Sequence, residues 1–328
     1  MRKVLLATTA LVAMGGVSAA SADISISGFG RYTYASWSDN ATTGDDTTGA
    51  TDVHFTVSGA STADSGMTMG GSITIANGAS DGRSIYISDD WGKLTFGGNG
   101  AGRSSHNSAS VGGMPGTNTD AWTTAIPSSL AANSRIGTGY TDASTIKYTS
   151  PDFNGLVVNL SVNNKGAGAS EQNDQSEWSV SYDTAFEGAS VGVDYASSST
   201  AAASGSGTTT DANSIGATVV VDDLTIMVGS SNNDKSDGTS KVATTDYGVD
   251  YAVNSDLTVE AWAVSSKNTG TTAASKDDKL TMTQVGATYT VTPGLTVSLT
   301  SRSFDFKDAA NVGNNKGDSV TARVTVTF

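Results

Sequence analysis

The chain has 328 residues, no cysteine, and 32 acidic against 18 basic residues, which gives a formal net charge of −14. This acidic balance argues against nucleic acid as a partner, because phosphate backbones bind clustered basic residues. A small scaffold stapled by disulfides is also excluded, so the fold must hold together without cross-links.

Residues 1–22 are predicted to be a cleaved secretory signal peptide. Two basic residues at positions 2 and 3 precede an apolar run at 4–14, and Ala20-Ser21-Ala22 supplies small residues for cleavage. Removing 22 of the 328 residues leaves 306, beginning at Asp23. No later apolar stretch approaches the roughly 18 residues that a membrane helix needs. The mature protein is therefore either soluble or crosses a membrane as strands.

Alternation of apolar and polar residues predicts a β-strand at each end of the mature chain. Isoleucines and tyrosines of 23–37 share one face, and 320–328 alternate without a break up to the terminal Phe328. The same reasoning predicts sixteen strands, at 23–37, 53–58, 66–77, 82–90, 92–98, 143–150, 154–164, 175–184, 188–197, 212–221, 223–231, 243–253, 256–266, 278–291, 294–306 and 317–328.

The connections between these strands alternate between short turns and long polar segments, as expected for hairpins stacked up and down. Long polar segments include 39–51, 198–212, 231–241 and 266–277, and the longest connection is 99–142. All four prolines fall in connections, which fits strands because proline cannot donate to a ladder.

Aromatic residues separate a membrane barrel from a soluble β-sandwich with one solvated face, whose core would place aromatics near strand centres. Here they gather at or beside the short-turn ends of the strands. The set is Trp91, Tyr148, Phe153, Tyr182, Phe186, Tyr251, Tyr289 and Phe328. A ring at one level is expected at a membrane interface. We therefore predict an all-β fold, a transmembrane antiparallel β-barrel of 16 strands formed by a single domain over 23–328.

Three segments and the last residue carry a resemblance to a known family. They are Asp23-Ile24-Ser25-Ile26-Ser27-Gly28, Asp90-Trp91-Gly92-Lys93-Leu94-Thr95-Phe96-Gly97, Lys147-Tyr148-Thr149-Ser150-Pro151-Asp152-Phe153-Asn154-Gly155-Leu156 and Phe328. In their order and spacing they resemble the trimeric general-diffusion porins of Gram-negative bacteria, in particular the alphaproteobacterial type.

The resemblance implies short periplasmic turns, long outer loops, and a third outer loop, 99–142, folded into the lumen as a constriction. It also implies a homotrimer in the outer membrane, in contact with membrane lipid and lipopolysaccharide. The chain departs from the family at three points. Gly98-Asn99 stands where an arginine is common, the long loop has few carboxylates, chiefly Asp120, and Val326 replaces an aromatic residue third from the end.

Strand alternation assigns several charged side chains to the lumen, because neighbours point to opposite faces. The basic ones are Arg31, Lys147, Arg302 and Arg323, and His54, Asp183, Asp194, Asp250 and Glu260 have the same parity. In the long loop, Arg103, Asp120 and Arg135 are expected either to form the constriction or to pin the loop through salt bridges. For each residue the alternative is a solvated wall position without a special role.

Two Gly-x-Ser-x-Gly matches, 78–82 and 188–192, could mark the serine nucleophile of a hydrolase. That motif acts in a sharp turn between a strand and a helix, whereas both matches lie among predicted strands. An enzyme is therefore not expected, and neither is a cofactor. Calcium bound weakly in acidic loops is the one exception: 233–238 resembles half a calcium loop, although Lys235 stands where an oxygen ligand belongs, and Asp45 and Asp46 are equally weak candidates.

The sequence therefore predicts an outer-membrane pore through which small hydrophilic solutes and ions diffuse passively, with a weak preference for cations. Acidic outer loops favour cations, whereas the wall arginines oppose them. The alternative is a secreted or surface-attached β-sheet adhesin without a pore. Channel activity in planar bilayers separates the two.

Overall fold

A computed structural model describes residues 23–40, 46–97, 130, 145–163, 174–201, 208–272, 276–308 and 313–328. Within these ranges, sixteen antiparallel strands form one closed barrel, in which each strand pairs with its neighbours along the chain. The predicted fold class is thus confirmed. No helix among these residues has both the length and the apolar character needed to cross a membrane. The predicted signal peptide lies outside the described residues and stays a prediction.

The strands have the following bounds. In chain order they are β1 (Asp23–Asp39), β2 (Asp46–Thr62), β3 (Thr68–Ala76), β4 (Ala79–Asp89), β5 (Gly92–Gly97), β6 (Thr145–Thr149), β7 (Leu156–Asn163), β8 (Gln175–Phe186), β9 (Ala189–Thr200), β10 (Thr210–Val221), β11 (Leu224–Lys235), β12 (Lys241–Ala252), β13 (Leu257–Asn268), β14 (Lys279–Thr292), β15 (Leu295–Lys307) and β16 (Asn315–Thr327).

The barrel closes where β16 pairs with β1, as the terminal alternation predicted. The register runs from Phe29 opposite Thr327 to Asp39 opposite Gly317. Beyond the last pair, the Phe328 amide donates to the Gly28 carbonyl at 3.1 Å, and the Gly28 amide donates to the Phe328 carbonyl at 2.9 Å. Every backbone group of a membrane-spanning sheet needs such a partner, so this seam removes the two free edges.

Several strands extend into segments that were predicted to be loops. β2 begins at Asp46, and β11 continues to Lys235. The clearest correction is the connection between β3 and β4, where the prediction of a loop at 78–81 was wrong. Asn77 and Gly78 alone form the turn, with φ of 50° and 85°. Asparagine and glycine tolerate positive φ, and two such residues in sequence make the tight hairpin turn that matches strand twist.

The polarity of the two faces changes part-way along β15. Near the short turns, the outward Leu299 is 56% exposed while the inward Thr300 is buried. Near the outer connections the order reverses, because Phe304 and Phe306 point inward and are buried, while Asp305 points outward. An apolar outer face marks the lipid-covered band of a barrel. The outer part of β15 therefore stands above the membrane.

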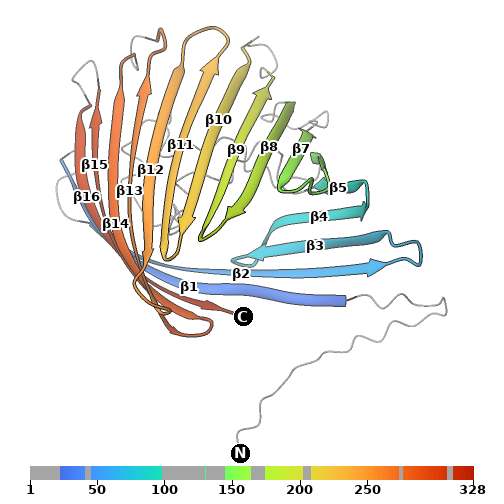
Figure 1. Cartoon of the computed structure of the whole chain (residues 1–328). Helices are drawn as coiled ribbons and strands as arrows, with labels where there is room; N and C mark the ends of the chain where they lie inside the picture. Colours follow the sequence, from blue (N-terminus) through green and yellow to red (C-terminus); the bar gives the residue numbers. More distant parts are fainter. Residues whose placement is uncertain are drawn as a thin grey trace, which may run out of the picture.

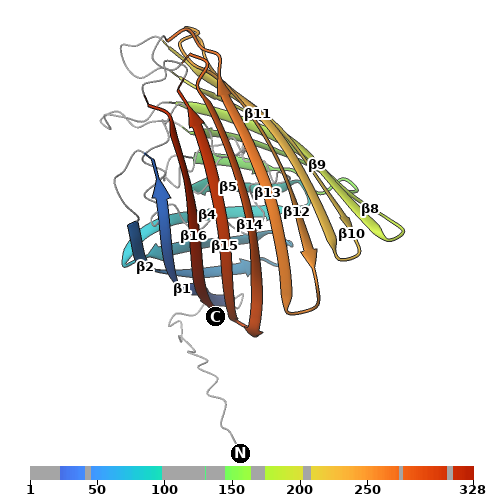
Figure 2. The same ribbon diagram turned by 90° about the vertical axis from the view of Figure 1, so that its left-hand side faces the viewer.

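The aromatic ring predicted at the short-turn rim is confirmed. Seven of its eight members keep between 43% and 65% of their surface exposed; Tyr182 has the lowest value and Phe186 the highest. The eighth, Tyr148, is half-buried, stacks on Trp91 with ring centroids 6.4 Å apart, and donates its hydroxyl to the Trp91 carbonyl. Figures 1 and 2 place the C-terminus at the bottom, beside the short turns of the last strands.

Two parts of the barrel wall differ in how they run in the view of Figure 1. There β8 to β16 run steeply to the top, whereas β2 to β4 lie nearly level and lower down, and the short Asn77-Gly78 turn ends β3 and β4 early. From these places in Figure 1 we call β12 to β15 the tall wall and β1 to β3 the low wall; the outer end of β1 stays paired with β16 as far as Asp39 opposite Gly317. The two walls line the lumen with different kinds of side chain, described next.

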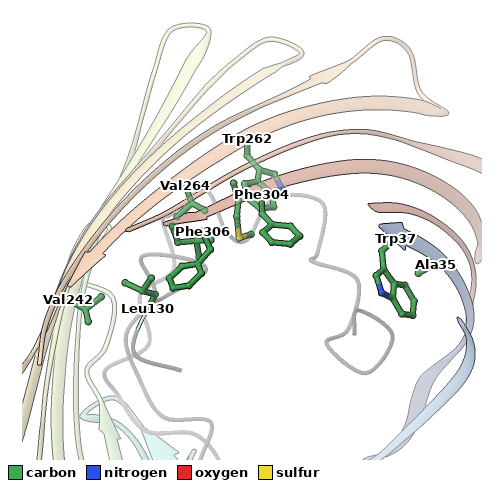
Figure 3. Packing of buried hydrophobic residues seen from close by; sticks show 10 residues of the cluster. Ala35, Trp37, Leu130, Val242, Trp262, Val264, Phe304 and Phe306 are labelled. Atoms are coloured by element: carbon green, nitrogen blue, oxygen red, sulfur yellow. The ribbon is translucent and has the colours of Figure 1, made fainter. Parts of the chain in front are cut away.

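Buried apolar side chains gather on the lumen face of the tall wall, near its outer end (Figure 3). We call this set the inner apolar patch; its members are Val242, Trp262, Val264, Leu280, Met282, Phe304 and Phe306, each 7% exposed or less. Ala35 and Trp37 of β1 belong to the same buried cluster. Leu130, in the connection between β5 and β6, belongs to the same cluster and is 8% exposed. Figure 3 shows it beside Phe306.

Candidate pore lining

Four of the seven predicted site residues lie in strands and project to the barrel interior. They are Arg31 in β1, Lys147 in β6, Arg302 in β15 and Arg323 in β16. The other three, Arg103, Asp120 and Arg135, lie outside the described residues. Their predicted place in a constriction stays a prediction.

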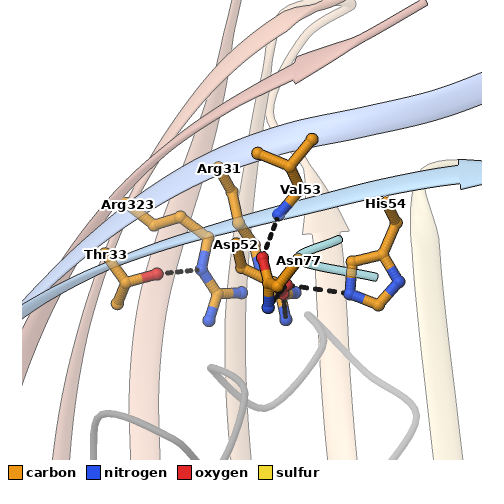
Figure 4. Close-up of polar contacts among 7 residues, drawn as sticks. All are labelled: Arg31, Thr33, Asp52, Val53, His54, Asn77 and Arg323. Carbon is orange, nitrogen blue, oxygen red and sulfur yellow. Dashed lines mark hydrogen bonds and ion pairs between the residues drawn. The ribbon is translucent and has the colours of Figure 1, made fainter. Parts of the chain in front are cut away.

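An ionic cluster centred on Asp52 lines the low wall (Figure 4). The Asp52 carboxylate forms an ion pair with Arg31 and lies 2.9 Å from Nε2 of His54. It also accepts a hydrogen bond from the Asn77 side-chain amide at 3.0 Å. The side chains of Arg31, Asp52 and His54 keep 17% to 25% of their surface exposed. This cluster therefore meets the water of the lumen, where ion pairs are screened.

An aromatic base supports the cluster. The Phe29 ring stacks on the His54 imidazole with centroids 4.6 Å apart and an interplanar angle of 17°. The Arg31 guanidinium carbon lies 5.1 Å from the centroid of the same Phe29 ring, within cation–π range. These contacts restrict the rotamers of both side chains, so the charges keep fixed positions on the wall.

Arg323 lies at the seam between β16 and β1. It stands opposite Thr33 in the register and donates from Nε to the Thr33 hydroxyl at 3.1 Å. Figure 4 shows Arg323 and Arg31 on adjacent strands of the same wall. The seam of the barrel thus contributes positive charge to the lumen.

A buried polar row crosses the tall wall below the inner apolar patch. Arg302 donates from Nε and Nη2 to Oε1 of Gln284 at 3.0 and 2.6 Å, and Gln284 donates to Oε1 of Glu260 at 2.7 Å. All three are at most 8% exposed. The Arg302 guanidinium also lies 5.7 Å from the centroid of a Trp262 ring. The row holds a positive and a negative charge in the wall with an amide between them.

The third row of polar residues crosses β6 to β8. Lys147 stands opposite Ser161, which stands opposite Glu177 on the next strand. The Ser161 hydroxyl donates to Glu177 at 3.4 Å, and the Gln175 amide donates to the other carboxylate oxygen at 2.9 Å. Lys147 is half-buried, and Glu177 is buried.

The sequence reasoning missed several charged residues that project to the lumen, among them Asp39, Asp52, Lys93, Glu177 and Asp246. Strand alternation contained the signal for Lys93, because its neighbour Leu94 belongs to the apolar face. Its ammonium nitrogen lies 4.0 Å from the centroid of the Tyr86 ring. Asp52 was missed because β2 was predicted to begin at Val53, whereas it begins at Asp46.

The geometry offers little to hydrolytic or metal chemistry in the described residues. Ser190 lies in β9 and His54 in β2, and these strands are not neighbours in the barrel. No group of three or more His, Cys, Asp or Glu side chains among the described residues is arranged to hold a metal ion.

The predicted calcium position at 233–238 carries one carboxylate that already has protein partners. Asp237 accepts hydrogen bonds from the Thr239 amide and hydroxyl and from the Thr208 hydroxyl. The bonds from Thr239 lower the pKa of Asp237 below its usual range. The carboxylate is thus engaged in holding two outer connections together, and calcium binding stays a prediction.

A closed sixteen-stranded barrel with an outward aromatic ring and charged, partly exposed side chains inside defines the class of outer-membrane β-barrel channels. The chain belongs to one family in that class: the Gram-negative porin family matches it over residues 7–309. It is therefore an outer-membrane diffusion channel. The adhesin alternative is set aside.

Solved structures share this fold. The anion-selective porin from Comamonas acidovorans has a TM-score of 0.68 at 13% identity, covering 94% of this chain and 100% of that one. Salmonella typhi OmpF in complex with daunomycin gives 0.65 at 16% identity, with coverage of 93% and 97%. The trimer form of Vibrio cholerae OmpT gives 0.61 at 12% identity, with coverage of 94% and 100%. No curated protein sequence matches the chain.

Proposed function

We propose that this porin passes small hydrophilic solutes and ions with a weak preference for cations. The observation that carries the proposal is the balance of charge on the lumen face of the described strands. The inward carboxylates include those of Asp39, Asp52, Glu177, Asp183, Asp194, Asp246, Asp250 and Glu260. The inward basic side chains are fewer and include Arg31, Lys93, Lys147, Lys235, Arg302 and Arg323.

Pairing offsets charges of both signs equally, so it leaves the excess of carboxylates unchanged. Arg31 pairs with Asp52, and Arg302 is linked through Gln284 to Glu260. Of the carboxylates, Asp183 is exposed near the short-turn rim. A wall with excess negative charge raises the local concentration of cations and lowers that of anions.

Reversal potentials in a salt gradient across planar bilayers test this selectivity. We expect the folded protein to form channels that favour the cation weakly, and Asp183→Asn to shift the reversal potential toward the anion. Asp305→Asn is a matched control, because Asp305 points outward above the lipid band. An anion-favouring wild type would overturn the proposal and would mean that the wall arginines dominate.

We also propose that the protein assembles as a homotrimer in contact with outer-membrane lipid and lipopolysaccharide. The trimer form of Vibrio cholerae OmpT, which shares the fold, supports this assembly, and the exposed apolar side chains of the outer face, such as Ile85 at 63%, support contact with lipid. Chemical cross-linking in native membranes tests it. A ladder ending at three subunits is expected, and a monomer at every cross-linker concentration would contradict it.

A further inference from the structure

A hollow of about 450 Å³ opens on the lumen face of β8, β9 and β10, close to their short-turn ends. These three strands lie side by side in the barrel (Figure 1). The polar side chains that line the hollow are those of Asp183, Ser190 and Thr218, and Ala185 and Val220 add apolar surface. All of these residues belong to paired strands, so the β-ladder fixes the shape of the hollow.

Glycine residues create the space around the Asp183 carboxylate. In the register, Asp183 stands opposite Gly192 of β9, and Gly192 stands opposite Thr218 of β10. On its other side, the Asp183 amide donates to the Gly155 carbonyl at 2.9 Å. Gly155 has a φ of 93°, and a Cβ built there would collide with the Asp183 carbonyl oxygen. Glycine thus stands on both sides of Asp183, which is exposed to the lumen.

The charge around the hollow is negative and is not offset by a basic side chain of the same strands. Within the bounds of β8, β9 and β10, all of which the structure describes, there is no lysine or arginine. Asp194 follows Gly192 by two residues on the same face of β9 and is buried opposite Ser181, so it adds a second carboxylate nearby. A concave wall of one sign attracts the opposite charge.

The lining of the hollow suits an organic ammonium group better than a metal ion. One carboxylate and two hydroxyls offer three acceptors, which match the three N–H donors of an ammonium group. Two strand spacings, about 10 Å, separate the backbones of Asp183 and Thr218, which leaves room for one such group between their side chains. Ala185 and Val220 can contact a short aliphatic chain. A divalent cation such as calcium needs six or more oxygen ligands, which this lining does not supply.

We propose that this hollow is a weak binding site for small solutes that carry a primary ammonium group, with Asp183 as the residue that determines specificity. The site lies at the short-turn end of the lumen, where the pore wall ends. The inference rests on the proposed cation preference and sharpens it. It assigns the retention of organic cations to one place in the wall, and not to the sum of the lumen charges.

Block of the channel current by n-butylammonium tests the site, with neutral butyramide as the matched probe. We expect n-butylammonium to reduce the wild-type current and butyramide to have no such effect. Asp183→Asn should weaken the block about three- to fivefold, as expected for the loss of one exposed ionic contact. Gly192→Val fills the hollow without removing a charge and should weaken the block as well, whereas a long-range charge effect predicts no change. Asp305→Asn, on the outer face, should leave the block unchanged.

Alkylation of an introduced thiol gives a second readout, because the chain contains no cysteine. Asp183→Cys treated with iodoacetate regains a carboxylate, whereas iodoacetamide adds a neutral amide of nearly the same size. We expect only the iodoacetate-treated protein to recover the block by n-butylammonium. Equal block of the two alkylated forms, or of the wild type and Asp183→Asn, would overturn the proposal. A wild type that favours anions yet shows the Asp183-dependent block would instead overturn the proposed ion selectivity and support the site.

Discussion

The tall wall and the low wall use the same β-ladder for opposite purposes. The lumen face of the tall wall is packed like a protein core, with Leu280, Met282 and Phe304 nearly out of contact with water. The lumen face of the low wall is apolar and buried only at Ala35 and Trp37, near its outer end, and carries the partly exposed Arg31 and His54 below them. The comparison indicates that one side of the barrel interior supports structure while the other contacts the permeating solution.

The largest expected effect is on the stability of the inner apolar patch, on the tall wall. Phe304→Ala should lower the free energy of unfolding by about 3–5 kcal/mol, because it leaves a cavity among buried side chains. Urea unfolding in lipid vesicles measures this. Phe186→Ala is the control, since Phe186 is 65% exposed at the short-turn rim. Equal losses for the two variants would show that the inner apolar patch is not a packed core.

The second largest effect is a difference in stability between arginine variants on the two walls. Arg302→Ala leaves the Gln284 carbonyl without its two donated hydrogen bonds in a buried site, at a cost of about 2–3 kcal/mol. Arg31→Ala removes a partly exposed ion pair and should cost less than about 1 kcal/mol. The same unfolding assay compares them. The account is contradicted if Arg31→Ala is the more destabilising change.

Ion selectivity should respond to changes in the Asp52 cluster on the low wall. Asp52→Asn leaves Arg31 without its carboxylate partner, so the positive charge facing the lumen increases. The reversal potential in a salt gradient should move toward the anion, and stability should change little. Arg31→Gln combined with Asp52→Asn should return the potential to near the wild-type value. No shift for Asp52→Asn would mean that this cluster does not meet the permeating ions.

The smallest effect concerns pH at the outer rim of the tall wall. Lys267 donates to Asp277 at 3.0 Å, and this contact lowers the pKa of Asp277. A lowered folded pKa adds stability that is present above the ordinary value, near 3.8, and is lost as pH falls through the folded value. Hydrogen exchange at residues 269–272 and 276–278 should therefore quicken only below about pH 4. Asp277→Asn should abolish that step, and a step near pH 6 would point to another group.

The fold was largely predictable from the sequence because its rules are local. Alternation and turn residues are enough to place sixteen strands, and the aromatic positions are enough to choose a membrane barrel. Strand ends were less accurate, as at β2 and β11, because polar residues above the lipid band look like loops although they remain paired.

The site was less predictable. Parity correctly placed Arg302 inside the barrel, but nothing in the sequence signalled that Gln284 and Glu260 bury it. The inner apolar patch was also missed, since parity was read against a rule of apolar outside and polar inside that holds only within the lipid band. The pairing of Asp52 with Asn77 depended on a two-residue turn that had been predicted as a longer loop.

Thiol accessibility tests the contrast between the walls most directly, again using the absence of natural cysteines. A charged, water-soluble thiol reagent added to open channels in a bilayer should react readily with His54→Cys and lower the conductance. The same reagent should leave Met282→Cys unmodified while the protein is folded. Equal reaction at both positions would contradict the account, because it would mean that water reaches the two walls alike.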